Sequence, residues 1–145
     1  MNNDMAALHN AAIALLAKRE YSRKELEMKL LRRNPTPQDL QTVLDALIEN
    51  NYQSDDRFAE VFIRQRIATG KGPYAIKQQL ALKGIDRDLI AQKLSEADVN
   101  WFDAAEDVYL KKYRGEAVVD QKDRAKRQRF MLSRGFSPAI VSEIL

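Results

Sequence analysis

The sequence has no cysteine and a single histidine, His9, among its 145 residues. Disulfides, thiolate zinc sites and cysteine nucleophiles are therefore excluded, and one histidine cannot build a histidine-rich metal site. We expect His9 to be a surface or half-buried residue of the first helix. The Gly70-Lys71 pair is not part of a P-loop, because no glycine stands five residues before Gly70 and no Ser or Thr follows Lys71. The sequence predicts no enzyme, no bound metal and no cofactor.

Glycine and proline are scarce, with five and four residues, so few positions suit the tight turns of β-rich folds. No apolar stretch approaches the roughly 20 residues that a transmembrane helix needs. The N-terminal stretch carries Asp4 where a signal peptide has a basic region, and its apolar residues are helically spaced. Hydrophobic residues make up 45% and charged residues 31%, which is typical of a globular protein. We expect a soluble, cytoplasmic monomer that does not contact a membrane.

Helix boundaries recur along the whole chain. Ser22 and Glu25 have the spacing of a capping box, in which each residue accepts a hydrogen bond from the other's backbone N–H. Thr36 precedes a proline that suits the first turn of a helix, and Ser54 precedes two aspartates that favour a helix N-terminus. Apolar residues follow these boundaries at helical spacing, which in the first helix begins at Asn10. We predict nine helices of roughly 8–16 residues and an all-α fold.

One sequence pattern occurs more than once in the chain. Residues 78–94 match residues 129–145 without a gap when Gly84 is set over Gly135, an offset of 51 residues. The earlier stretch YSRKELEMKLLRRN matches KGPYAIKQQLALKG at an offset of 50, which sets Asn34 over Gly84. Asn is the next-best residue to Gly for a left-handed helix cap. The pattern therefore occurs three times, with a nearly constant period.

This period predicts three tandem three-helix repeats in an elongated arrangement. Their predicted ranges are residues 1–52, 53–97 and 98–145, each resembling a helix-turn-helix unit in outline. Because a unit this small buries its own apolar face poorly, we expect the repeats to stack and share cores. The third repeat differs from the others through a longer polar segment around residues 114–121.

Positive charge is concentrated in two stretches although the net charge is only +3. Residues 57–87 hold seven basic and two acidic residues, and residues 122–134 hold six basic residues against Asp123 alone. Glu60 is the only carboxylate of the middle stretch before Asp86, so few sequence neighbours neutralise its cations. Such stretches are either solvated helix faces or sites for an anionic partner.

Lys and Arg that neutralise phosphates provide affinity for nucleic acid and make it salt-dependent. The same side chains also suit acidic loops of a protein partner, and charge alone does not separate the two. Tyr74 suits stacking on a base or burial in the core. The candidate partner or DNA-binding residues are Arg57, Arg64, Arg66, Lys71, Tyr74, Lys77, Lys83, Lys122, Arg124, Lys126, Arg127 and Arg129.

The ordered set of residues from Ala12 to Leu145 resembles the RecX family, the bacterial regulators of the RecA recombinase. The likeness is densest in the middle unit, with DDRFA at residues 55–59 and KGP at residues 71–73, and it continues in RGFS at residues 134–137. The resemblance implies an all-α fold of three tandem three-helix repeats. It also implies binding to the RecA–DNA filament, with restraint of strand exchange and of the coprotease activity that triggers the DNA-damage response. It implies no catalytic residues.

Three functional hypotheses follow. The first is a non-enzymatic regulator that binds the RecA nucleoprotein filament, with weaker binding to bare single- or double-stranded DNA. The second is a tandem helix-turn-helix DNA-binding protein that acts without RecA. The third is a helical adaptor that binds an acidic protein.

Overall fold

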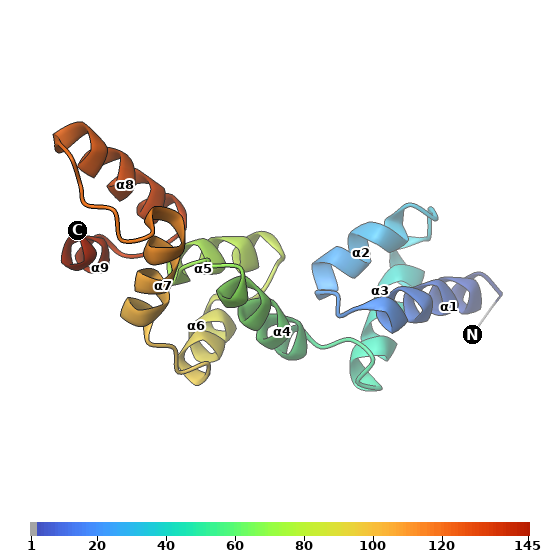
Figure 1. Cartoon of the computed structure of the whole chain (residues 1–145). Helices are drawn as coiled ribbons and strands as arrows, with labels where there is room; N and C mark the ends of the chain where they lie inside the picture. The colour runs from blue at the N-terminus through green and yellow to red at the C-terminus, as the bar shows by residue number, and fades with distance from the viewer. Residues whose placement is uncertain (1–2) are drawn as a thin grey trace.

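The computed structural model describes residues 3–145, and every regular element within that range is a helix. The helices form three groups of three that follow one another along an elongated molecule, with the N- and C-terminal groups at opposite ends (Figure 1). None of the helices in residues 3–145 is long and apolar enough to span a membrane. The predicted all-α, elongated fold is confirmed. The bounds are α1 Asn3–Lys18, α2 Arg23–Leu31, α3 Pro37–Glu49, α4 Asp55–Ala68, α5 Pro73–Leu82, α6 Arg87–Glu96, α7 Trp101–Tyr113, α8 Gln121–Ser133 and α9 Pro138–Ile144.

The predicted caps begin these helices. The Ser22 hydroxyl accepts from the Glu25 N–H at 3.1 Å, and the Glu25 carboxylate accepts from the Ser22 N–H at 3.1 Å, so the capping box of α2 is complete. Thr36 and Ser54 cap α3 and α4 in the same way. The first helix, α1, begins at Asn3 and contains His9 and the apolar residues spaced from Asn10 onward. Its Leu8 side chain is only 3% exposed and packs in the first core.

Each group of three helices has its own hydrophobic core. The first and second helices of a group both pack on the third, so that α1 and α2 cover α3, α4 and α5 cover α6, and α7 and α8 cover α9. The buried apolar side chains fall into three separate clusters, one for each group. The expectation that the repeats share cores is therefore wrong. Three mutually packed helices enclose enough Leu, Ile and Phe on their inner faces to bury them locally. Of residues 3–145, only the half-buried Trp101 packs against two clusters.

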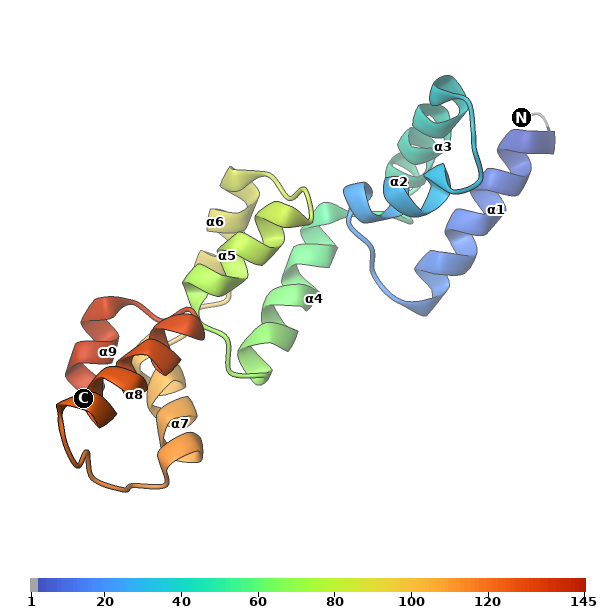
Figure 2. The same ribbon diagram turned by 90° about the horizontal axis from the view of Figure 1, so that it is seen from above.

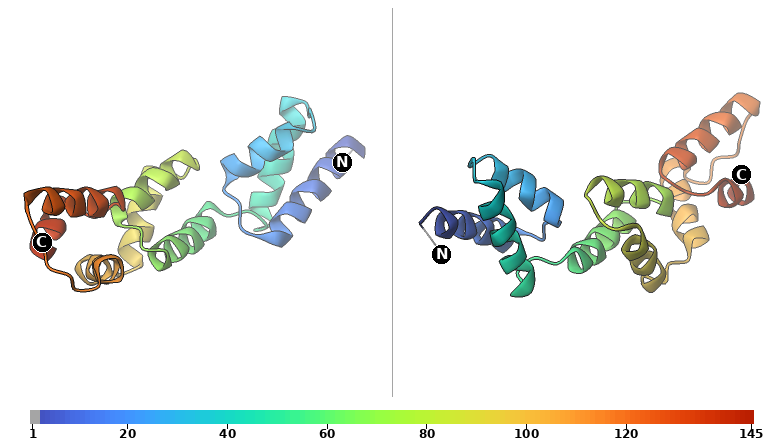
Figure 3. Two further views of the ribbon diagram at one scale, coloured as in Figure 1. Left: turned by 45° about the horizontal axis from the view of Figure 1, so that its top comes forward. Right: turned by 180° about the vertical axis from the view of Figure 1, so that it is seen from behind.

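The second helices of the groups meet end to end. The N–H of Gly72, which caps the start of α5, donates to the carbonyl of Arg134 at the end of α8, at 2.7 Å. The N–H of Tyr74 donates to the carbonyl of Gly135 at 3.0 Å. The end of α5 in turn reaches the start of α2, where Lys24 Nζ donates to the carbonyl of Leu82 at 3.2 Å. The order α8, α5, α2 is visible from other directions (Figures 2 and 3).

These junctions explain why glycine recurs in the repeated pattern. Gly135 has a φ of +101° and Gly84 a φ of +81°, both in the left-handed region. A Cβ on Gly135 would stand 2.5 Å from Ala75 Cβ, and one on Gly84 would stand 2.7 Å from Lys24 Cβ. Asn34 has a φ of +52° at the matching place in the first repeat. Asn meets the backbone requirement there because, after Gly, it tolerates a left-handed conformation best.

Candidate partner interface

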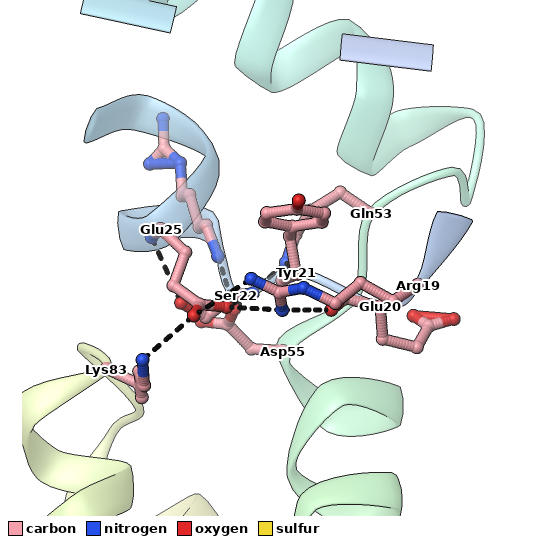
Figure 4. A network of polar contacts seen from close by, with 9 residues as sticks. Arg19, Glu20, Tyr21, Ser22, Glu25, Gln53, Asp55 and Lys83 are labelled. Carbon is pink, nitrogen blue, oxygen red and sulfur yellow. Dashed lines mark hydrogen bonds and ion pairs between the residues drawn. The ribbon is translucent and has the colours of Figure 1, made fainter. Parts of the chain in front are cut away.

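The junction of α2 with the second repeat is a cluster of opposite charges centred on Glu25 (Figure 4). Lys83, just after α5, forms an ion pair with Glu25 at 3.0 Å, and Arg19 forms another at 3.2 Å. Burial alone raises the pKa of the Glu25 carboxyl, but hydrogen bonds from Arg19, Lys83 and the Ser22 N–H outweigh it and lower that pKa below its ordinary value. Lys83 therefore joins two repeats within the chain.

Arg57 is also engaged inside the molecule. Its Nε donates to the Glu20 carboxylate at 2.9 Å, and its two terminal nitrogens donate to the carbonyls of Asn51 and Tyr52 at 3.1 and 3.0 Å. The sequence placed few carboxylates near these middle cations. The fold supplies Glu20 and Glu25 from the first repeat, which lies far from them in sequence. Arg57 and Lys83 thus hold the first and second repeats together.

The two aspartates at the start of α4 bind within the chain as well. Asp55 Oδ1 accepts from the Arg23 N–H at 2.8 Å and from Gln53 Nε2 at 2.9 Å, and the same Gln53 nitrogen donates to the carbonyl of Tyr21 at 3.1 Å. Asp56 forms an ion pair with Lys93 at 2.6 Å. The N-terminus of α4 is therefore tied both to the start of α2 and to α6.

The other candidate residues of the middle repeat lie in different surroundings. Arg66 donates to Gln79 at 3.0 Å and lies over the Phe62 ring, which keeps it against the second core. Arg64 is exposed on α4 beside a cleft that Lys93 also lines. Tyr74 is 56% exposed on α5, and Lys77 Nζ lies 5.4 Å from its ring centre. Tyr74 and Lys77 are thus both available on the outer side of the second helix.

The candidates on α8 divide into buried and exposed positions. Arg127 is 4% exposed, donates to Tyr109 Oη at 2.7 Å and to the carbonyl of Glu116 at 2.8 Å, and pairs with Asp123 at 3.1 Å. Arg124 is half-buried and donates to the carbonyl of Leu145 at 2.8 Å. Lys122, Lys126 and Arg129 are exposed, and their spacing of four and three residues puts them on one helix face.

Within residues 3–145, the exposed candidates other than Arg64, which lies on α4, are on the row of second helices. Lys77 and Tyr74 lie on α5, and Lys122, Lys126 and Arg129 lie on α8, whose end meets the start of α5. Lys71 follows the end of α4 and lines a separate cleft between the second and third repeats. Arg57, Lys83 and Arg127 are used to hold the fold. The row of α2, α5 and α8 is the candidate interface.

Sequence models of three RecX domains match the chain in order. The first three-helix domain of RecX matches residues 9–47, the second matches residues 54–94 and the third matches residues 98–145. The chain belongs to the RecX family.

Individual members of the RecX family are similar over nearly all of their length. A protein named Regulatory protein RecX from Pseudomonas fluorescens strain SBW25 is 36% identical over 141 residues, which cover 97% of this chain and 91% of that protein. One of the same name from Actinobacillus pleuropneumoniae serotype 5b is 42% identical over 127 residues, covering 88% and 83%. The crystal structure of RecX from Lactobacillus salivarius matches with a TM-score of 0.84 and 25% identity over 99% of this chain and 96% of that one. The resemblance to the RecX family is confirmed.

Sequence reasoning missed the contribution of α2 to the row. Lys24 and Lys29 are exposed on α2, and Arg32 and Arg33 are exposed directly after it. Residues 1–56 contain nine acidic and seven basic side chains, a total that hides the local excess. All seven basic ones lie between positions 18 and 33, against three acidic ones. A count over a shorter window, one helix long, would have found this third basic stretch.

Proposed function

We propose that this chain regulates the RecA recombinase by binding the RecA–DNA filament, and that it restrains both strand exchange and coprotease activity. It then acts in DNA repair, DNA recombination and the SOS response to DNA damage. Membership of the RecX family supports a regulatory role, since the relatives bear the name Regulatory protein. The observation that supports an extended anionic partner is the row of second helices, with exposed cations on α2, α5 and α8. RecA as part of that partner follows from membership of the RecX family.

The proposed mechanism is steric and electrostatic. An elongated row of separate basic helices suits a partner that repeats along an axis, because each repeat of the chain can contact an equivalent place on the filament. Modest contacts made by linked modules gain effective concentration from one another. The proposed units are residues 1–52, 53–97 and 98–145, acting as one monomer in the cytoplasm without catalytic chemistry.

A second candidate function is DNA binding without RecA. The exposed Tyr74 beside Lys77 favours it, since an aromatic ring and a cation together suit a stacked base and its phosphate. The two candidates differ in which target the chain prefers at the same salt concentration.

The deciding experiment compares affinity for RecA-coated DNA with affinity for bare single-stranded and duplex DNA in one buffer. We expect the tightest binding to the RecA-coated strand. A row variant, Lys77→Glu with Lys126→Glu, should lose most of this preference. The control, Lys18→Glu with Arg87→Glu, makes the same change of charge at exposed positions on α1 and α6, outside the row, and should bind like the unmodified chain. Equal affinity for bare and coated DNA would instead favour DNA binding without RecA.

A further inference from the structure

A basic cleft separates the second repeat from the third. It has a volume of about 590 Å³, and its walls come from the end of α4 and the following loop, from α7 and from α8. This volume lies in the range of roughly 300–1,000 Å³ that is usual for small-molecule sites. The cleft is therefore large enough to hold a small ligand or one repeating unit of a longer, flexible one.

The cations of the cleft outnumber its acids. Of the residues that the structure describes, Lys71, Lys111, Lys112 and Arg134 line it, and Asp107 is the single carboxylate. Within the described chain, residues 3–145, none of the three lysines forms an ion pair within 4.0 Å. Positive potential therefore accumulates in a concave place with partly apolar walls, where water screens it less than on a flat surface.

The junction between the first and second repeats has the opposite character. There Arg19, Arg57 and Lys83 meet carboxylates, at distances of 2.9 to 3.2 Å, so the positive charge is neutralised within the fold. The junction between the second and third repeats is closed by the backbone N–H groups of Gly72 and Tyr74 and by the Arg134 side chain, which donates to carbonyls of the loop after α4. The lysines of the cleft take no part in these bonds, and they remain for a ligand.

The free donors of the cleft are the ammonium groups of its lysines. Among the described residues, Arg134 is the only guanidinium of the cleft, and its Nη2 and Nε already donate to the carbonyls of Thr69 and Gly70. Lysine binds an anionic oxygen as a point charge, without a demand on planar geometry. It pairs with carboxylates elsewhere in this chain, as Lys93 does with Asp56, so the lysines suit an anion in general, and the proposed function supplies DNA phosphate as that anion.

We infer that this cleft binds a phosphodiester of single-stranded DNA, with Lys71 and Lys111 on the phosphate and the apolar side chains of Ile67 and Val108 against the adjoining nucleoside. A single strand bends into a concave site, whereas a duplex presents its phosphates on a stiff convex surface. The inference rests on the proposed function only in taking DNA as the source of the phosphate. It assigns a role to Lys111, which sequence reasoning did not select, and to Lys71, which it did.

The test measures binding of a labelled oligothymidylate to the full chain by fluorescence anisotropy over a range of salt concentrations. The cleft variant is Lys71→Gln with Lys111→Gln, and the matched control is Lys18→Gln with Arg87→Gln, which removes the same charge at exposed sites elsewhere. We expect the cleft variant to bind several-fold more weakly and to lose roughly 1.4 units of salt slope, about 0.7 for each lost contact with a single strand. The control should keep the slope of the unmodified chain.

A second readout locates the site. Titration with the same oligonucleotide should shift the backbone amide resonances of residues 69–71 and 108–112 before those of the other repeats. Equal losses in the cleft variant and the control, or no loss in either, would overturn the inference. So would a cleft variant that keeps its affinity for the oligonucleotide but binds RecA-coated DNA more weakly, because the cleft would then take an acidic protein segment. The measurements with bare DNA do not involve RecA. This test can therefore still be interpreted if the chain proves not to regulate RecA.

Discussion

Arg127 and Arg129 are two residues apart on α8 but have opposite surroundings. Arg127 is buried against Tyr109 and donates to two carbonyls of the polar segment between α7 and α8, whereas Arg129 is exposed. The buried guanidinium satisfies carbonyls that a loop without secondary structure would otherwise leave unpaired. Hydrogen bonding to the Tyr109 hydroxyl raises the pKa of Arg127, with Asp123 contributing in the same direction, so its charge is fixed. Arg127 thus stabilises the third repeat.

Arg127→Ala is therefore expected to destabilise the third repeat without a direct effect on partner binding. The change leaves the carbonyls of Glu116 and Ala117 without the Arg127 donor. It also removes the ion pair with Asp123, whose carboxylate keeps the Val119 N–H. We expect the melting temperature of this repeat to fall by roughly 5 °C or more, and Arg129→Ala to change it by less than about 2 °C. Fluorescence of Trp101, the single tryptophan, reports on the second and third cores and measures this melting. Equal melting of the two variants would contradict the role given to Arg127.

A pattern in the sequence does distinguish these arginines. Arg127 and Met131 are four residues apart and both buried, so Arg127 continues the inward stripe of α8. Counting basic residues by stretch ignored which face of the helix each residue lies on, and it placed Arg127 among the candidates for partner binding. Which carbonyls it meets could not be predicted, because they belong to a loop whose path is set only by the folded repeat.

At the scale of the helices, the residue that follows the second helix of a repeat meets two requirements. Its backbone must adopt a positive φ, and its side chain must leave room for the neighbouring second helix. Gly135→Asn keeps a residue type that tolerates a positive φ but adds a Cβ only 2.5 Å from Ala75 Cβ. We expect this substitution to cost about 1–3 kcal/mol and to disturb the junction of α8 with α5. The reverse substitution, Asn34→Gly, should change the free energy of unfolding by less than about 0.5 kcal/mol.

Urea unfolding of the two variants measures this difference. If Gly135→Asn were as stable as the unmodified chain, the close approach of α8 to α5 would not limit the residue at position 135. The asymmetry between the two positions would then need another explanation.

The junction between the first and second repeats should respond to acid through Glu25. The pKa of Glu25 is lowered in the folded chain, so its contribution to stability is present above the ordinary value of 4.5 and is lost as the pH falls through the lowered pKa. Glu25→Gln removes this contribution at every pH. The difference in urea midpoint between the two proteins should be largest near neutral pH and vanish below the lowered pKa. A difference that stays constant with pH would show that the Glu25 charge does not stabilise the junction.

Helix boundaries were predictable because they depend on residues next to one another in sequence, such as Ser22 with Glu25 or Thr36 before Pro37. The junctions were not, because they join residues that only the fold brings together, such as Glu20 with Arg57. The period of the sequence pattern revealed the repeats but not how they meet. Shared cores were expected from the small size of each unit, and the three helices of each repeat instead enclose one another.

For the whole molecule, separate cores predict unfolding in stages. Each repeat has its own buried cluster, and the junctions contain hydrogen bonds and ion pairs but few apolar contacts. Trp101 fluorescence follows only the second and third cores, whereas far-UV circular dichroism follows all helices in residues 3–145. We expect the two urea transitions not to coincide. Coincident transitions would show that the repeats unfold as one cooperative unit.

The partner of the whole molecule was not predictable from charge. Charge left open a solvated face or an anionic partner. The fold placed the exposed candidates other than Arg64 on the row of second helices, and Lys71 in the cleft beside it. The RecA–DNA filament enters through the RecX family and is the central claim of the proposed function.

The most direct test of that claim is the rate of RecA-promoted strand exchange, measured while the chain is added in increasing amounts. We predict that the rate falls at less than one copy of the chain per RecA. The row variant Lys77→Glu with Lys126→Glu should need several times more protein for the same effect, and the control Lys18→Glu with Arg87→Glu should match the unmodified chain. A rate that stays unchanged at one copy per RecA, with a folded chain that binds bare DNA, would contradict the claim.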